Sequence, residues 1–311
     1  MPLVPRQLTP LDAEALAAVQ GVLRAAERVD GTPPISDQAL LAASLGARQL
    51  YAYTSAAEGT DASSPAPIAV AVLGAGEIDL VVHPESRGSG VGSEVLQHLL
   101  STVDRDANPG LRAWSHGDAP APRALLSRAG FTPARTLFRL ALDPTALQAA
   151  IAQARAMPAG FTMRPYAADR PTDAAEWVRV NAAAFADHPE QGAVTLTEFT
   201  ALTGEPWFDP ADLMLAWDTA TGDLAGYAWV KTLRTEHGVD TELYVLGVDP
   251  AYAGRGLGAG LLGETLRRMA THQPDRITLY VDGTNAQARD IYDRVGFVVD
   301  SVSTQWVRNS G

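Results

Sequence analysis

The chain has 311 residues, of which 46% are hydrophobic and 19% are charged, with no cysteine and a formal net charge of −12 at pH 7. This length favours two domains, the acidic balance argues against broad binding to nucleic-acid phosphates, and the lack of cysteine excludes disulfides and thiolate metal sites. The N-terminus lacks a secretory pattern and no apolar run reaches the length of a membrane span, so a cytoplasmic protein is expected.

In the first half, hydrophobic periodicity predicts an amphipathic helix over residues 12–28 and strands over 50–54 and 68–72. The Ser-, Ala-, Gly- and Pro-rich stretch 55–67 is typical of a hairpin loop. A strand ending near Val82 then leads through a glycine-rich turn into a further helix. The pattern indicates a mixed α/β fold in which helices flank one central sheet.

Asp143 and Pro144 are predicted to begin a linker helix that runs to Met157 and is ended by Pro158, Ala159 and Gly160. We therefore expect an N-terminal domain over 1–142, a linker over 143–160 and a C-terminal domain over 161–311. The elements predicted in the second domain are a helix over 172–185, strands over 214–217, 227–232 and 242–248, a helix over 258–271, a strand over 277–281, a helix over 286–295 and a final strand.

The two halves are related by an internal repeat, because Leu80 and Leu246 begin two similar segments that are 166 residues apart. The same separation aligns Val82 with Val248, Pro84 with Pro250, Gly88 with Gly254, Gly90 with Gly256, Gly92 with Gly258, Arg128 with Arg294, Gly130 with Gly296 and Phe131 with Phe297. One register held without insertion or deletion through these positions indicates a duplicated domain.

Each copy carries a glycine-rich turn between a strand and a helix, at residues 87–92 and 253–258. Unpaired backbone N–H groups and the helix dipole at such a turn suit a pyrophosphate, which glycine allows to approach closely. The spacing is not that of a Rossmann fingerprint, and no Gly-Lys-Ser/Thr follows as in a Walker loop.

These turns resemble the signature of the GNAT superfamily of acyltransferases, Arg/Gln-x-x-Gly-x-Gly/Ala after a strand, which wraps the pyrophosphate of acyl-CoA. The first copy matches with Arg87, Gly90 and Gly92, whereas the second keeps its glycines but has Ala253 at the Arg/Gln position. The resemblance implies two tandem GNAT domains, each a mixed central sheet flanked by helices.

The resemblance also implies a general base on the strand that enters the turn and a tyrosine acid on the last helix, which here are Glu242 and Tyr292. The equivalent positions of the first copy are Gly76 and Leu126, and neither side chain can transfer a proton. Glu77 is the nearest acid, and strand alternation predicts that it faces the opposite side of the sheet. The N-terminal domain is therefore expected to be non-catalytic, although it could still hold acyl-CoA.

Several stretches resemble the mycothiol synthase family, including residues 179–192, 207–210, 226–231, 242–250 and 279–282. Members of that family acetylate the cysteinyl amine of Cys-GlcN-inositol with acetyl-CoA. The resemblance implies acceptor contacts at Asp37, Glu190, Lys231, Glu242 and Tyr280. It implies acetyl-CoA contacts at Leu246, Gly247, Val248, Ala253, Gly254, Arg255, Gly256, Leu257, Gly258, Ala259, Asn285, Ala286, Gln287, Ala288, Arg289 and Asp290, and in the first copy at Leu80, Val81, Val82, Gly88, Ser89, Gly90, Val91, Gly92 and Ser93.

The leading hypothesis is a direct acetyl transfer without an acyl-enzyme, in which the Val248 N–H polarises the thioester carbonyl. Two alternatives stay open, namely a tandem GNAT enzyme for another small amine, such as an aminoglycoside or amino-acid derivative, and an acyl-CoA-binding protein without turnover. The six histidines show no ligand spacing, so no metal is expected. A monomer with small-molecule substrates, and with neither a nucleic-acid nor a membrane partner, is expected.

Overall fold

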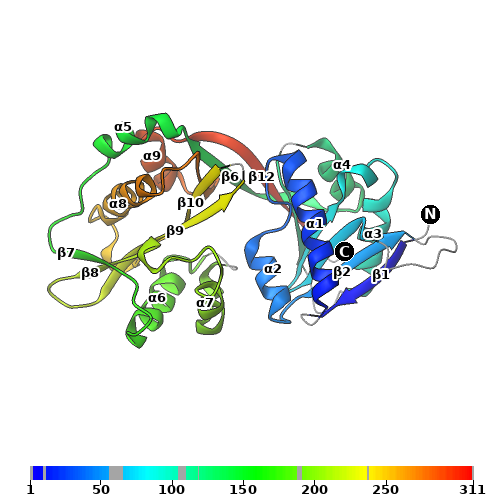
Figure 1. The fold of residues 1–311 in the computed structure, drawn as a ribbon, viewed down its shortest axis with the longest axis horizontal. Coiled ribbons are helices and arrows are strands. Elements are labelled where there is room, and N and C mark those ends of the chain that lie inside the picture. Colours follow the sequence, from blue (N-terminus) through cyan, green and yellow to red (C-terminus); the bar gives the residue numbers. More distant parts are fainter. Residues whose placement is uncertain are drawn as a thin grey trace. The chain divides into compact units, whose positions relative to one another are not determined.

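The computed structural model describes residues 3–9, 12–55, 66–103, 110–117, 119–187, 191–236 and 238–309. The chain forms two compact units: unit 1 comprises Met1–Leu137 and Ser301–Gly311, and unit 2 comprises Phe138–Asp300 (Figure 1). Each unit has helices on a central sheet, which confirms the mixed α/β class. None of the helices within the described ranges is long and apolar enough to span a membrane.

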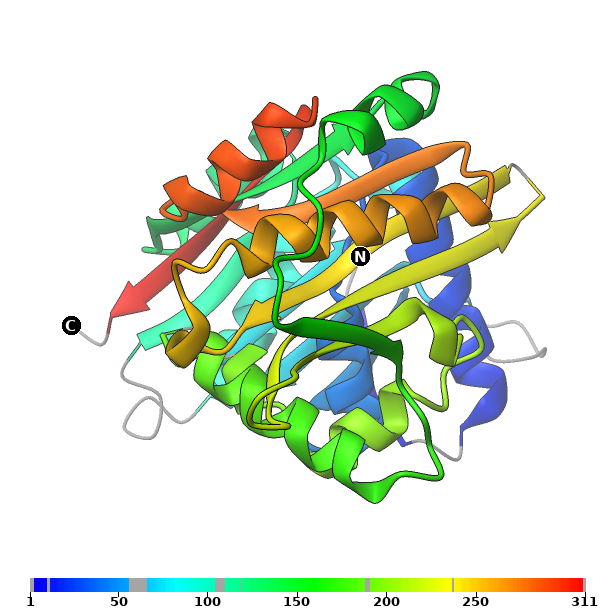
Figure 2. The same cartoon turned by 90° about the vertical axis from the view of Figure 1, so that its left-hand side faces the viewer.

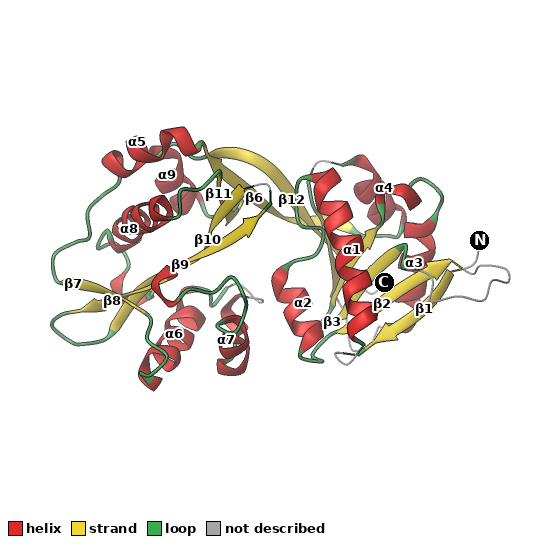
Figure 3. Ribbon diagram, in the orientation of Figure 1, coloured by secondary structure: helices red, strands yellow, loops and turns green. Residues whose placement is uncertain are grey.

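Unit 1 has the strand order β1-β2-β3-β4-β5-β12, in which β4 and β5 are parallel and the other neighbours are antiparallel. Helices α1 and α2 pack on one face of this sheet and α3 and α4 on the other (Figure 3). The strands are β1 (Leu3–Leu8), β2 (Gln49–Ser55), β3 (Ala69–Gly74), β4 (Glu77–Val82), β5 (Gly110–Ser115) and β12 (Val298–Asn309), and the helices are α1 (Ala13–Asp30), α2 (Asp37–Ser44), α3 (Val91–Thr102) and α4 (Pro120–Arg128).

Unit 2 has the strand order β6-β11-β10-β9-β8-β7, in which β10 and β11 are parallel and β7 to β10 are antiparallel. Helices α5, α8 and α9 cover one face, and α6 and α7 lie on the other (Figure 2). The strands are β6 (Thr132–Leu142), β7 (Phe161–Pro165), β8 (Leu213–Asp218), β9 (Leu224–Thr235), β10 (Gly238–Val248) and β11 (Arg276–Asp282), and the helices are α5 (Leu147–Gln153), α6 (Pro171–Ala184), α7 (Leu196–Leu202), α8 (Leu257–Thr271) and α9 (Ala286–Arg294).

Two strands are shared between the units. The last five residues of β6 belong to unit 2, although in the repeat β6 closes the first copy, and β12 belongs to unit 1 from Ser301 onward. The boundaries predicted at 142 and 161 describe the sequence repeat and stay predictions. In space, the units divide the chain at 137/138 and 300/301.

The helix predicted to run from residue 143 to Met157 is shorter in the structure, where α5 ends at Gln153 and Ala154 is extended. The cause is close packing of the following segment against two glycines of α8. A Cβ on Gly263 would lie 2.6 Å from the Arg155 carbonyl oxygen, and one on Gly260 would lie 3.0 Å from the Met157 Cα. The glycines therefore let an extended backbone, rather than a further helical turn, lie against α8.

Candidate active site

The glycine-rich turn of unit 2 lies between β10 and α8, and its backbone has the geometry of an anion cradle. Asp249 accepts a hydrogen bond from the Ala251 N–H at 2.9 Å and begins a 3₁₀ turn over Pro250–Tyr252. Gly254 and Gly256 then have φ of 77° and 79°, in the left-handed region that favours glycine, and α8 begins at Leu257. The first N–H groups of α8 have no intrahelical partner and can donate to a diphosphate.

The strand that enters this cradle contains a β-bulge that the sequence analysis did not predict. In the pairing of β10 with β9, Leu243 lies opposite Val230 and Val245 opposite Trp229, so Tyr244 is the extra residue. The packing agrees, because Leu243 and Leu246 both lie in the core beneath α8, although they are three residues apart. The bulge thus changes which side chains of β10 face each side of the sheet.

Beyond the bulge, β10 is no longer paired with its parallel neighbour. The ladder of β10 and β11 runs from the pair Asp240 and Arg276 to the pair Leu243 and Leu279, whereas the strands continue to Val248 and Asp282. The edge of β10 that carries the predicted contacts Leu246, Gly247 and Val248 therefore has no ladder to β11. Strand edges with unpaired backbone groups can bind an extended amide-containing chain, such as the pantetheine arm of CoA.

Gly247 brings this edge of β10 close to a buried tyrosine. A Cβ on Gly247 would lie 2.7 Å from Cε1 of Tyr227, which leaves room for glycine only. The Tyr227 hydroxyl donates to Asn181 Oδ1 at 2.6 Å, and the Asn181 amide donates to the Gln191 carbonyl at 2.6 Å. Glu190, predicted to contact the acceptor, precedes Gln191 and lies outside the described residues.

Three of the predicted acceptor residues lie together on the α6/α7 side of the sheet of unit 2. Glu242 of β10 is paired with Lys231 of β9 in register, so their side chains share a face. The Lys231 Nζ lies 5.4 Å from the centroid of the Trp207 ring and 5.9 Å from that of Tyr244. Burial, together with the nearby Glu242 charge, raises the pKa of Tyr280 to about 12.

Asp37, the other predicted acceptor contact within the described residues, lies in unit 1. It is exposed in the first turn of α2, where Ser36 caps the helix by accepting from the Ala39 N–H at 3.2 Å.

The predicted acid Tyr292 lies on α9, on the opposite side of the unit 2 sheet from Glu242. Asn285 caps this helix by accepting from the Ala288 N–H at 3.0 Å, so the predicted contacts at 285–290 form its first turns. Tyr292 packs against Phe297 with ring centroids 5.9 Å apart and is 9% exposed. Burial raises the pKa of Tyr292 to about 12, so the phenol is protonated at neutral pH.

Unit 1 repeats the cradle. Gly88 and Gly90 have φ of 77° and 90°, and α3 begins directly after Gly90, so the predicted contacts at 88–93 form the turn and the first residues of α3. Leu80, Val81 and Val82 form the end of β4. The signature Arg87 is held by Asp30 of α1 through two hydrogen bonds of 2.7 and 2.8 Å.

The positions equivalent to the predicted acid Tyr292 and the predicted base Glu242 have structural roles in unit 1. Gly76, with φ of 74°, forms the tight turn between β3 and β4 together with Ala75, and Leu126 is buried in the core under α4. The prediction that Glu77 faces the opposite side was wrong. The β3–β4 register is continuous, without the bulge, and Glu77 alternates with Ile78, which belongs to the core beneath α3.

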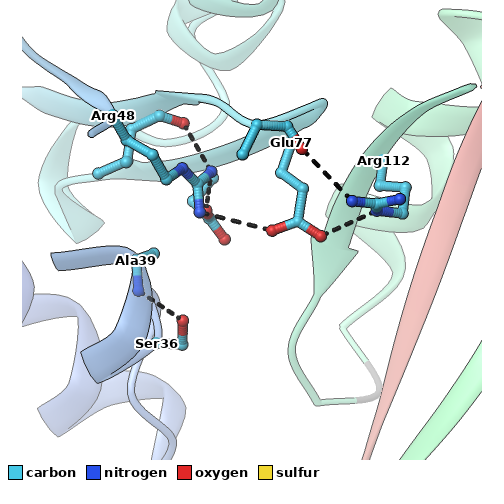
Figure 4. Close-up of polar contacts among 8 residues, drawn as sticks. Ser36, Ala39, Arg48, Glu77 and Arg112 are labelled. Atoms are coloured by element: carbon cyan, nitrogen blue, oxygen red, sulfur yellow. Dashed lines mark hydrogen bonds and ion pairs between the residues drawn. The ribbon is translucent and has the colours of Figure 1, made fainter. Parts of the chain in front are cut away.

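Glu77 therefore lies on the α1/α2 side of its sheet, as Glu242 lies on the α6/α7 side of its own, but its carboxylate is held by arginines. Arg112 Nε donates to one carboxylate oxygen of Glu77 at 2.9 Å, and a terminal nitrogen of Arg48 donates to the other oxygen at 3.5 Å (Figure 4). Arg48 also donates to Asp79 at 2.7 Å, although burial raises the pKa of Asp79 to about 6. Both carboxylate oxygens of Glu77 are therefore already engaged by arginine side chains.

The residues present fit acyl-CoA. Each unit offers left-handed glycines, a helix N-terminus and a strand edge leading to it, which together match a diphosphate followed by an extended arm. Within the described residues, no group of three or more His, Asp or Glu side chains could hold a metal ion. A tandem arrangement of this fold with these cradles defines the class of GNAT acyltransferases.

Comparisons with known proteins agree with this class. Residues 177–297 match the Acetyltransferase (GNAT) family. The tandem GNAT protein from the clavulanic acid biosynthesis pathway shares the fold with a TM-score of 0.74 at 17% identity, covering 100% of this chain and 99% of that chain. The chain is 39% identical to the mycothiol acetyltransferase of Clavibacter michiganensis over 93% of this chain and 91% of the relative. It is 36% identical to that of Sanguibacter keddieii over 98% and 96%.

The chain therefore belongs to the mycothiol acetyltransferase family, and it is an acetyl-CoA-dependent N-acetyltransferase.

Proposed function

We propose that this enzyme transfers the acetyl group of acetyl-CoA to the cysteinyl amine of desacetylmycothiol, giving mycothiol and CoA. The observation that carries the proposal is the group formed by Glu242, Lys231 and Tyr280 on one face of the sheet, beside the point where the β10–β11 ladder ends. A cationic amine joined to a polyhydroxylated sugar suits a carboxylate, a tyrosine and a lysine in one place.

In this proposal, the acetyl-CoA arm lies along β10 beyond the bulge, and the acceptor approaches from the α6/α7 side. Glu242 removes the amine proton through a water molecule, which is feasible because the pKa of an α-amino group is only about 8. The Val248 N–H polarises the thioester carbonyl, and attack by the amine expels the CoA sulfur.

Tyr292 then acts on the departing sulfur from the α9 side. A phenol with a pKa of about 12 is a weaker acid than a thiol, whose pKa is about 8.5. Its main contribution is therefore a hydrogen bond to the thiolate as the carbon–sulfur bond breaks, and complete proton transfer follows only as the product leaves.

Release of the CoA thiol from acetyl-CoA and desacetylmycothiol tests the proposal. We expect Glu242→Gln and Tyr292→Phe each to lower kcat by on the order of 100-fold, a usual loss for acid–base groups. Retention of near-normal turnover by both variants would remove their assigned roles. A panel of aminoglycosides and amino-acid derivatives serves as the control for the acceptor, since a preferred amine from that panel would overturn desacetylmycothiol as the substrate.

For unit 1 we propose acyl-CoA binding without turnover. The support is the intact cradle around Gly88 and Gly90, combined with Gly76, Leu126 and the arginine-held Glu77 where proton transfer would be needed. Calorimetric titration with acetyl-CoA should then give two sites, of which Gly256→Trp in unit 2 removes one and Gly90→Trp removes the other. Only the unit 2 variant should lose turnover. We further propose that the enzyme works in the cytoplasm as a monomer, which light scattering can test.

A further inference from the structure

One arginine links the acceptor face of unit 2 to a strand that the sequence repeat assigns to the first copy. Arg139 lies on β6, among the residues of that strand that belong to unit 2. The strand order β12-β6-β11-β10 places β6 directly beside β11, which carries Tyr280, and one strand away from β10, which carries Glu242. The Arg139 side chain is only 8% exposed.

The guanidinium of Arg139 donates to two partners, the Asp300 carboxylate and the Tyr280 hydroxyl. Its Nε and a terminal nitrogen contact the same carboxylate oxygen of Asp300, at the start of β12. Arg139 also donates a hydrogen bond to the Tyr280 hydroxyl, and the carboxylate of Glu242 lies near enough to this hydroxyl to affect its pKa. Because a guanidinium can only donate, the phenol oxygen accepts this bond and its own O–H must point elsewhere.

The repeat shows that this arrangement is not a requirement of the fold. With the offset of 166 residues, the counterparts of Arg139, Tyr280 and Glu242 in the other copy are Gln305, Trp114 and Gly76. Gln305 is likewise buried in its strand and lies opposite Trp114 in the β12–β5 register. The same strand position thus accepts a neutral side chain, and the arginine occurs where the tyrosine and the glutamate occur.

We propose that Arg139 is a positioning residue of the acceptor site, which orients the Tyr280 hydroxyl so that its proton points toward the acceptor. The inference rests on the proposed function, because Tyr280 and Glu242 are its acceptor contacts. It implies that the catalytic half is completed by a residue preceding the predicted linker, so that a C-terminal fragment beginning at 143 or 161 lacks a part of its own site.

The test is a double-substitution cycle on the full chain. Arg139→Gln installs the side chain that the repeat tolerates, and Tyr280→Phe removes the hydroxyl. We expect each single variant to raise the KM for desacetylmycothiol by on the order of 10-fold, the usual scale for a lost hydrogen bond to a charged group. The KM for acetyl-CoA should stay within about twofold, and the double variant should be no worse than the poorer single variant, since both remove one interaction.

Arg276→Gln is the matched control, because Arg276 lies 3.7 Å from the same Asp300 carboxylate but is 42% exposed. We expect it to leave the KM for the acceptor within about twofold, as is usual for a solvent-screened pair. Equal losses in Arg276→Gln and Arg139→Gln, or additive losses in the cycle, would overturn the inference. If Arg139→Gln fails to fold, Arg139→Met replaces it in the cycle, because methionine fills a buried position without a hydrogen-bond donor, and a wild-type KM for the acceptor in that variant would have the same consequence.

The two failures can be told apart. If the wild-type enzyme does not acetylate desacetylmycothiol, the proposed function fails, and the cycle is then measured with the preferred amine. If the wild type is active but the cycle is additive, only the role of Arg139 fails.

Discussion

Replacing Gly247 with alanine tests whether close packing against Tyr227 sets the position of β10, along which we propose that the arm of acetyl-CoA binds. The new Cβ would lie 2.7 Å from Cε1 and 2.9 Å from Cζ of that ring. Favourable carbon contacts are at about 3.5–4.0 Å, so strand and ring must separate by about 0.8 Å or more. The ring is fully buried, lies 5.1 Å from the Trp177 ring between centroids, and is tied to Asn181, so we expect β10 to move instead.

Overpacking of this kind costs about 1–3 kcal/mol of the free energy of unfolding. For a unit of the size of unit 2, each kcal/mol lowers the midpoint of thermal unfolding by roughly 2–4 °C, so this midpoint should fall by about 2–12 °C. Since β10 carries Leu246 and Val248, the KM for acetyl-CoA should rise as well. Gly21→Ala is the control, because a Cβ there meets nothing within 4 Å and should stabilise α1 by about 1 kcal/mol. An unchanged midpoint and an unchanged KM in Gly247→Ala would refute the reasoning.

Two further predictions concern charge and pH. Lys231→Met keeps the unbranched shape of a buried side chain but removes its terminal ammonium, which is the cation opposite Glu242. The KM for the acceptor should therefore rise by on the order of 10-fold while the KM for acetyl-CoA stays the same, and steady-state kinetics in which both constants rose together would contradict this. Burial raises the pKa of Tyr292 from 10 to about 12, so the unfolded chain loses this proton first as the pH rises. The stability contributed by the neutral phenol is therefore complete below pH 10 and is lost between pH 10 and 12, by about 1.4 kcal/mol per pH unit. Urea unfolding at pH 9 and pH 11 should show a smaller loss for Tyr292→Phe than for the wild type, and equal losses would show that this tyrosine does not titrate as described.

The features that the sequence predicts well are those determined by neighbouring residues. Left-handed φ at Gly254 and Gly256 requires glycine, and a strand before them and a helix after them are visible from periodicity alone. The helix predicted over 258–271 accordingly begins at Leu257 and ends at Thr271. The same local signals exist in the first copy, which is why the repeat could be aligned through its glycines.

The features that the sequence analysis missed depend on pairing between distant segments. The bulge at Tyr244 depends on the pairing of β10 with β9. The only sign of it in the sequence is that two core leucines of one strand, Leu243 and Leu246, are three residues apart instead of two or four. The partner of Arg139 is Asp300, 161 residues away, and they meet only because β6 enters unit 2. A repeat alignment assigns each strand to its own copy, so it cannot predict such an exchange.

The difference between the two copies lies in the hairpin before the cradle as much as in the identity of one residue. In unit 2, β10 begins at Gly238, four residues before Glu242, and the bulge after it lets Glu242 face Lys231 while Leu246 still packs under α8. In unit 1 the equivalent position is Gly76, which the tight turn holds at a φ of 74° that disfavours any other side chain. The acid on the correct face, Glu77, is already bound by Arg112. A single substitution to glutamate at position 76 would therefore strain the turn without creating a base, and recovering catalysis in unit 1 would require a longer hairpin with its own bulge.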